Sequence, residues 1–133
     1  RLMFSRKEAA RLLEYAIQKS ASIDQPFVLS KKMKNVNMYK LACALSDNIK
    51  EVGLRPGEKL NETLISEKEL PFCSLEGEYI ILQDGAPPRG SSPLQNLREY
   101  SSLTAPQMTP SDLNSIILEG KRDDLDPLLR NLY

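Results

Sequence analysis

The stretch GLRPGEKLNE, residues 53–62, is the most informative part of this chain of 133 residues. Pro56 presets the backbone angle of a turn, and Gly57 supplies the conformational freedom that a tight turn needs. Arg55 directly before the turn is held stiffly, and its planar fork of donors matches the oxygens of a phosphate group. The stretch therefore has the parts that a diphosphate site needs.

The predicted surroundings of this turn support the same interpretation. Partial alternation of apolar residues predicts a strand over 49–54, and the pattern after the turn predicts a short helix over 59–66. Free N–H groups at a helix start favour an anion nearby. The alternative is an exposed surface turn in which Arg55 forms an ion pair with Glu58, and the spacing alone favours this alternative, because short motifs often match by chance.

The composition excludes several classes of protein. Eighteen basic and eighteen acidic side chains cancel, which argues against a general binder of nucleic acid or of an anionic membrane surface. No apolar run approaches the length of a membrane span. Cys43 and Cys73 are too few for a disulfide framework and His is absent, so we expect two reduced structural thiols in a cytoplasmic protein and no zinc site.

The first third of the chain predicts two helices and two short strands, of which the first is a strand end over 2–4. Ser5 and Glu8 form a capping box that opens the first helix. A polar loop and a strand over 27–29 follow, and three lysines after it predict a solvated loop more readily than a phosphate contact. The first helix has a predicted apolar face of Ala9, Leu12, Leu13, Ala16 and Ile17, and the second has one of Met38, Leu41, Ala42 and Leu45.

The rest of the chain predicts one clear strand and two further helices. The strand covers 79–82, and an irregular loop rich in Pro and Gly covers about 84–99. Ser111 is the predicted N-cap of a helix that Gly120 ends, and a last helix covers 123–133. The pattern as a whole predicts one small α/β or α+β domain over 1–133, with few strands and no long βαβ series.

Residues 53–65, GLRPGEKLNETLI, resemble a signature of the polysaccharide-biosynthesis branch of the extended short-chain dehydrogenases/reductases, which includes UDP-N-acetylglucosamine 4,6-dehydratases. Residues 1–10, 27–28, 38–45 and 99–102 resemble further segments of that family in the same order. The resemblance covers most of residues 1–118. It implies an α/β fold, mostly helices with a few short strands, that forms the C-terminal substrate-binding portion of such an enzyme.

The resemblance also implies roles for individual residues. Arg55 would contact the diphosphate of a UDP-sugar, and the loop of Ser101, Ser102, Leu103 and Thr104 would line the substrate site. Four residues would hold the motif's own structure together: Pro56, Gly57, Glu58 and Lys59. Two positions depart from the family pattern: Asn61 stands where His is frequent, and Leu103 stands where a polar residue is frequent, which leaves a backbone contact there.

The resemblance implies a lyase of surface polysaccharide or glycan biosynthesis, whose Rossmann half binds NADP and carries the catalytic Tyr-x-x-x-Lys pair. Neither the glycine-rich NADP turn nor that pair stands in this chain. Tyr15 and Lys19 have the spacing, but they lie within the first predicted helix without the strand and glycine loop, so we reject them. We therefore expect this chain to be a piece of a longer protein, a homo-oligomer when intact, and to be catalytically inert alone.

Two alternatives stay open at this point. An epimerase or reductase of the same branch would share this C-terminal portion, because the portion does not hold the residues that distinguish the reactions. A helical interaction module without a ligand would instead offer its amphipathic helices to a partner protein.

Overall fold

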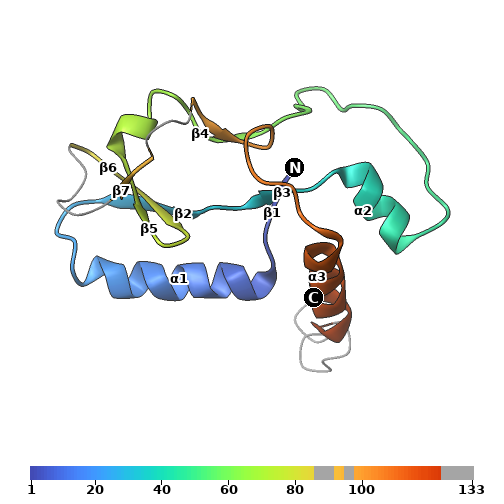
Figure 1. Ribbon diagram of the computed structural model, residues 1–133, viewed down its shortest axis with the longest axis horizontal. Coiled ribbons are helices and arrows are strands. Elements are labelled where there is room, and N and C mark those ends of the chain that lie inside the picture. Colours follow the sequence, from blue (N-terminus) through green and yellow to red (C-terminus); the bar gives the residue numbers. More distant parts are fainter. Residues whose placement is uncertain (86–91, 95–97, 124–133) are drawn as a thin grey trace.

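The computed structural model describes residues 1–85, 92–94 and 98–123 (Figure 1). Within these ranges the chain forms three α-helices, one short 3₁₀ helix and eight short strands, and all the strand pairs are antiparallel. The fold is thus a small α/β domain with more strands than we expected. The helices are α1 (Arg6–Ser20), α2 (Met38–Leu45), α3 (Pro110–Asp123) and the 3₁₀ helix η1 (Leu70–Phe72); the strands are β1 (Leu2–Met3), β2 (Phe27–Lys31), β3 (Lys34–Asn35), β4 (Thr63–Ile65), β5 (Cys73–Glu76), β6 (Tyr79–Gln83), β7 (Ser92–Pro93) and β8 (Tyr100–Ser101).

A four-stranded sheet in the order β2-β6-β5-β7 forms the centre of the fold, and α1 runs along one side of it (Figure 1). The predicted strand over 79–82 is confirmed as β6, because its run of β-branched and aromatic residues suits a buried strand. Ile80 and Ile81 are each only 1% exposed. Since successive side chains point to opposite faces, both faces of this sheet are covered.

The α1 helix begins as predicted, but its apolar face is only partly covered. Ser5 accepts a hydrogen bond from the Glu8 amide and Glu8 accepts one from the Ser5 amide, so the capping box is confirmed. Leu13 and Ile17, however, are 67% and 74% exposed. The helix is turned so that polar side chains reach the sheet: Tyr15 stacks on Tyr79 with ring centroids 4.0 Å apart.

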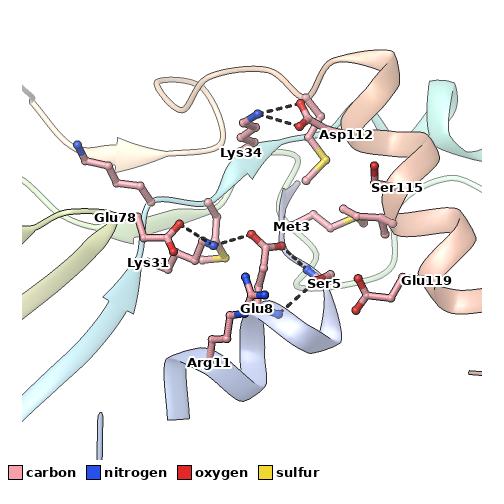
Figure 2. Close-up of a pocket in the computed structure, with 14 residues that line it drawn as sticks. Met3, Ser5, Glu8, Arg11, Lys31, Lys34, Glu78, Asp112, Ser115 and Glu119 are labelled. Atoms are coloured by element: carbon pink, nitrogen blue, oxygen red, sulfur yellow. Dashed lines mark hydrogen bonds and ion pairs between the residues drawn. The ribbon is translucent and has the colours of Figure 1, made fainter. Parts of the chain in front are cut away.

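The sequence predicts that Lys31, Lys32 and Lys34 lie in a solvated loop. This prediction is wrong for Lys31, which is the last residue of β2. Its ammonium group forms ion pairs with Glu8 of α1 and with Glu78 of the β5–β6 turn, and the residue is only 8% exposed (Figure 2). Lys34 lies in β3 and pairs with Asp112 of α3 at 2.9 Å. Lys32 is exposed, as expected. The alternating pleat explains the difference, because it places Lys31 on the face that α1 covers.

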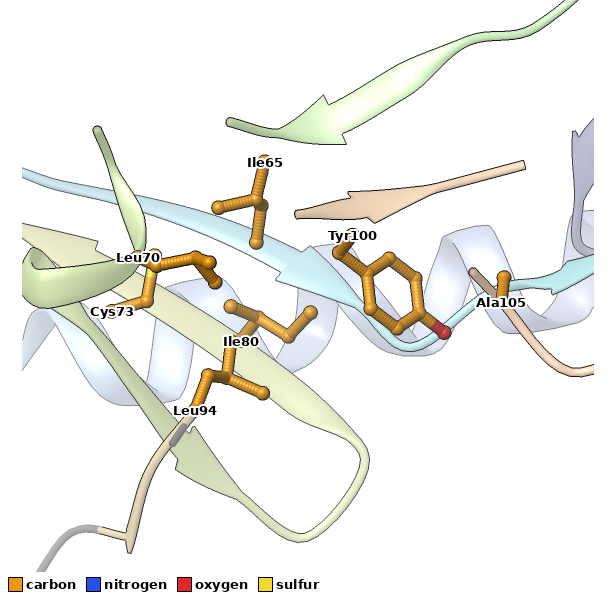
Figure 3. Close-up of a cluster of buried hydrophobic side chains, with 7 residues drawn as sticks. All are labelled: Ile65, Leu70, Cys73, Ile80, Leu94, Tyr100 and Ala105. Atoms are coloured by element: carbon orange, nitrogen blue, oxygen red, sulfur yellow. The ribbon is translucent and has the colours of Figure 1, made fainter. Parts of the chain in front are cut away.

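The opposite face of the sheet carries the hydrophobic core (Figure 3). Tyr100 of β8 is part of this core, and its hydroxyl donates to the Met33 carbonyl oxygen at 2.7 Å. Of the two free thiols, Cys73 is in the core, whereas Cys43 is exposed on α2, so only Cys73 is a structural thiol of the core. The core residues are Ile65, Leu70, Cys73, Ile80, Leu94, Tyr100 and Ala105.

The predicted strand over 49–54 and helix over 59–66 are both wrong. Residues 46–62 form neither helix nor strand, and they are exposed throughout. The strand in this region is β4, which begins at Thr63 and pairs with β8. The pairing partner lies almost forty residues further on, and two β-branched residues in β4 favour a strand over the predicted helix.

The third helix begins two residues earlier than predicted. Thr109 is its N-cap: the Thr109 hydroxyl accepts from the Asp112 amide, and Asp112 accepts from the Thr109 amide at 2.8 Å. Pro110 then occupies the first helical position, where its missing N–H has no consequence. Gly120 does not end the helix, which continues to Asp123. Residues 124–133 of the predicted last helix and most of the loop over about 84–99 lie outside the described residues, while Asp123 belongs to α3.

Candidate functional site

The turn at the centre of the sequence motif forms as predicted. The Glu58 amide donates to the Arg55 carbonyl oxygen at 3.0 Å, which closes a four-residue turn. Gly57 has φ of +83°, which is the left-handed conformation that the third position of a Pro-Gly turn needs. The Arg55 side chain is exposed, and within the described residues its guanidinium forms no hydrogen bond or ion pair.

Glu58 contacts the backbone of the turn, and its ion-pair partner is Arg1 rather than the Arg55 expected of a surface turn. One carboxylate oxygen accepts from the Arg55 backbone amide at 3.1 Å. The other accepts from the Arg1 guanidinium at 2.9 Å, and the second nitrogen of that guanidinium donates to Glu62 at 2.8 Å. Lys59 is exposed and has no such partner among the described residues.

The end of the motif lies directly beside the loop that begins at Ser101. The Ser102 amide donates to the Glu62 carbonyl oxygen at 2.8 Å, and the Glu62 amide donates to the Ser102 hydroxyl at 3.0 Å. These two bonds continue the β4–β8 pairing, in which Thr63 lies opposite Ser101. The structure therefore brings together the two segments that sequence reasoning selected for the substrate site.

The four selected loop residues have different environments. Ser101 is 1% exposed, and its hydroxyl accepts from the Leu103 amide at 3.2 Å. The Thr104 hydroxyl accepts from the Ser101 amide and donates to the Glu99 carbonyl oxygen. Ser101 and Thr104 thus hold the loop in shape. Ser102 faces the groove described next, and Leu103 is 69% exposed with its amide already engaged.

A groove of about 630 Å³ lies where these segments meet, which is within the usual size range of ligand sites. Leu54 and Glu58, on either side of the Arg55 turn, line it together with Ser102, while Arg55 itself is not part of the lining. The other lining residues come from the chain start, the β3–α2 junction, the motif and the segment before α3: Arg1, Asn35, Val36, Asn37, Met38, Tyr39, Leu60, Asn61 and Gln107.

Sequence reasoning did not select most of these lining residues. Tyr39 is 70% exposed at the groove, and Asn61 attracted notice only as a departure from the family pattern. Gln107 lies next to Asn35 through an isolated parallel bridge. Each is an ordinary polar or aromatic residue, and they are far apart in the sequence, so no local signal marks them as one site.

A family model described as polysaccharide biosynthesis protein matches residues 1–83, which is more than half of the chain and includes Arg1 and the whole motif. The chain belongs to this polysaccharide biosynthesis family. No curated protein matches the chain. The loop of Ser101 to Thr104 lies beyond the matched residues, so its place in the site rests on its pairing with the motif.

This family member has a second groove, with a volume of about 460 Å³, between α1, β3 and α3. Its charged side chains largely neutralise one another: Lys31 pairs with Glu8 and Glu78, and Lys34 pairs with Asp112 (Figure 2). The Lys34 ammonium and the Thr109 groups lower the pKa of Asp112 to about 2. Because these groups already have partners, the second groove is the weaker candidate site.

Tyr15 and Lys19 do lie together, but not as a catalytic pair. Both donate to the carboxylate of Glu76, at 2.6 Å from the Tyr15 hydroxyl and at 2.7 Å from the Lys19 ammonium. The hydrogen bond to Glu76 raises the pKa of Tyr15 to about 12. A proton-transferring phenol needs a pKa close to the working pH, so this shift has the wrong direction for such a role.

The described residues do not fit a dinucleotide cofactor such as NADP. A dinucleotide site needs a glycine-rich turn that leaves the first N–H groups of a helix free for the pyrophosphate. Here side chains of Ser5, Asn37 and Thr109 cap the three α-helices. The same described residues contain no cluster of three or more potential metal ligands, and none of their helices is both long enough and apolar enough to cross a bilayer.

Proposed function

We propose that this chain is the substrate-binding portion of a nucleotide-sugar 4,6-dehydratase that acts on UDP-N-acetylglucosamine in surface polysaccharide or glycan biosynthesis. The observation that carries the proposal is the junction of the Arg55 motif with the Ser102 loop at one groove. The family match supports polysaccharide biosynthesis, and the motif's resemblance to dehydratases supports the finer assignment.

In this proposal Arg55 binds the diphosphate at the rim of the groove. Its guanidinium is exposed and has no partner among the described residues, so binding a diphosphate would cost it no existing ion pair. A guanidinium can meet two phosphate oxygens at once, which fixes orientation as well as adding affinity. A diphosphate held there would place the nucleoside and the sugar on either side of the turn.

The groove supplies groups that suit the rest of a nucleotide sugar. Tyr39 offers an exposed aromatic ring, and Asn61 and Gln107 offer side-chain amides in the lining of the same groove. Binding energy from these remote contacts can position the sugar for chemistry that other residues perform. Since the described residues do not fit NADP, we derive no hydride-transfer step here, and this chain's contribution is to bind and orient the substrate.

The proposal is tested by measuring UDP and uridine binding to the intact protein by calorimetry. We expect Arg55→Ala to weaken UDP binding by roughly 10- to 100-fold, the range for a lost hydrogen bond between charged groups, and to leave uridine binding unchanged. Arg11→Ala is the matched control, because Arg11 is an exposed arginine that lines the second groove. Unchanged UDP binding by Arg55→Ala would overturn the diphosphate assignment.

A product assay distinguishes the dehydratase from an epimerase of the same branch. Incubation of the intact enzyme with UDP-N-acetylglucosamine gives a product lighter by one water if it is a dehydratase. An epimerase gives a product of unchanged mass. Mass spectrometry of the nucleotide-sugar pool reads this result directly.

A second candidate function, an interaction module, is favoured by one observation. Large apolar side chains are exposed along α1 and along residues 38–60, among them Ile17 at 74%, Val52 at 79% and Leu60 at 73%. Clustered apolar exposure marks contact surfaces. A module of this kind would not bind UDP, so the same calorimetric titration decides between the two functions.

A further inference from the structure

The backbone of Arg1 is hydrogen-bonded to the rest of the fold. Its backbone nitrogen donates to the Val36 carbonyl oxygen at 2.9 Å, and its carbonyl oxygen accepts from the Val36 amide at 2.7 Å. Val36 itself is only 3% exposed. This two-way pairing extends the β1–β3 ladder by one step and fixes the point from which the Arg1 side chain projects.

The Arg1 side chain bridges the Arg55 turn and the end of the motif. One guanidinium nitrogen donates to Glu58 at 2.9 Å and the other donates to Glu62 at 2.8 Å. These residues lie 57 and 61 positions further along the chain. The side chain of Arg1 is 24% exposed, so this fork is partly shielded from solvent.

The motif has few other attachments to the fold. At its end, Glu62 exchanges hydrogen bonds with Ser102. Around the Arg55 turn, the side-chain ion pair that links the turn to the rest of the described structure is the one between Arg1 and Glu58. The same Glu58 carboxylate accepts from the Arg55 amide at 3.1 Å, so a chain of contacts runs from the anchored Arg1 to the backbone of Arg55.

We propose that Arg1 is the positioning residue of the diphosphate site: it holds Glu58, and Glu58 holds the turn that presents Arg55. This inference rests on the proposed function for its ligand, but not for its geometry. Arg1 needs its planar fork, because one compact ammonium group cannot serve two carboxylates equally well. Without Arg1, residues 53–60 keep their internal turn but lose its direction relative to the groove.

Hydrogen exchange measured by mass spectrometry on the intact protein, without ligand, tests the geometric part. We expect Arg1→Gln to speed exchange in peptides covering 53–60 by roughly fivefold, corresponding to the loss of one ordinary net hydrogen bond, and Arg1→Lys to give a smaller change. Peptides from β2 and β6 serve as the internal reference for folding. Unchanged exchange over 53–60 in Arg1→Gln would overturn the inference, whatever the protein binds.

Binding of UDP and uridine by the intact protein tests the functional part. We expect Arg1→Gln and Glu58→Gln each to weaken UDP binding roughly fivefold, to leave uridine binding unchanged, and to have no further effect in an Arg55→Ala background, since residues in one network are not additive. Glu51→Gln is the matched control, because it removes the same charge from an exposed residue of the same segment that has no ion pair among the described residues. If Arg1 acted only by neutralising charge, Glu58→Gln would strengthen UDP binding, and that result would refute positioning.

The outcomes separate this inference from the proposed function. If Arg55→Ala loses UDP binding while Arg1→Gln binds normally, the positioning role is wrong and the proposed function stands. If Arg55→Ala binds UDP like the parent protein, both fail together. If Arg1→Gln and Arg55→Ala both lose UDP binding but keep uridine binding, both are supported.

Discussion

Replacing Lys31 with Met is the most direct test of how α1 is held on the sheet. The Lys31 ammonium lies between Glu8 and Glu78, and its side chain is 10% exposed (Figure 2). The Met side chain retains most of the apolar stem, so the substitution mainly removes the charge and its two hydrogen bonds. The effect therefore reports on the ion pairs more than on packing.

The expected magnitude follows from the exposure of the two partners. A hydrogen bond to a charged group contributes about 1.5 to 3 kcal/mol where solvent is excluded. The Glu8 and Glu78 side chains are 33% and 51% exposed, so solvent screens both pairs, and the second contributes at most about 1 kcal/mol. We therefore expect Lys31→Met to lower the free energy of unfolding by about 2 kcal/mol.

Urea denaturation followed by circular dichroism measures this change. Lys32→Met is the matched control, since Lys32 is the next residue and is exposed, and surface substitutions usually change stability by less than about 0.5 kcal/mol. If Lys31→Met and Lys32→Met unfold at the same urea concentration, the ion pairs do not stabilise the fold and the reasoning is refuted.

The pH dependence of the same variant gives an independent check. Partial burial disfavours the charged form of Glu8, but hydrogen bonds from Lys31 and from the Ser5 amide outweigh it and hold the pKa of Glu8 below 4.5. The stabilisation is therefore present above pH 4.5 and is lost as pH falls through the lowered pKa. The stability difference between Lys31→Met and the parent should shrink under those acidic conditions.

Three further predictions concern single contacts. Thr109→Ala should lower the free energy of unfolding by about 1 kcal/mol through loss of the α3 cap, whereas Ser111→Ala, at the position that the sequence favoured, should leave it unchanged in the same urea assay. Glu76→Gln should move the Tyr15 phenol titration, followed by ultraviolet absorbance, from about 12 down toward its ordinary value. Cys43 should react with a thiol reagent in the native protein, whereas burial, which raises the pKa of Cys73 to about 11, should protect that thiol until urea is added; equal rates would show that Cys73 is not in the core.

The elements that the sequence predicted correctly have signals contained within a few residues. The Ser5–Glu8 capping box spans one helical turn, and the strand at 79–82 is a continuous apolar run that begins with an aromatic and two β-branched residues. Likewise, Pro56 and Gly57 determine their turn without help from the rest of the chain. In these cases the local chemistry and the final fold agree, so the prediction needs no tertiary information.

The elements that the sequence missed depend on distant partners or on competing local signals. In the sequence, Lys31 resembles two nearby solvated lysines. It lies between two carboxylates only because α1 and the β5–β6 turn pack beside it in the fold. At the start of α3, Thr109 and Ser111 both suit an N-cap, and Pro110 at the first helical position decides for Thr109. Leu13 and Ile17 match a helical face, yet polar contacts of α1 turn them outward.

The ten residues of the motif contain both a feature that local sequence determines and features that depend on distant partners. Residues 53–62 predict their own turn, but the strand and helix expected on either side are absent. What replaces those elements is a set of contacts from far along the chain: the Arg1 fork at Glu58 and Glu62, and the Ser102 exchange with Glu62. The motif therefore owes its internal shape to local turn chemistry and its placement at the groove to two distant residues. For that reason, substitution at Arg1 should disturb the proposed diphosphate binding even though no local pattern marks Arg1 as part of a site.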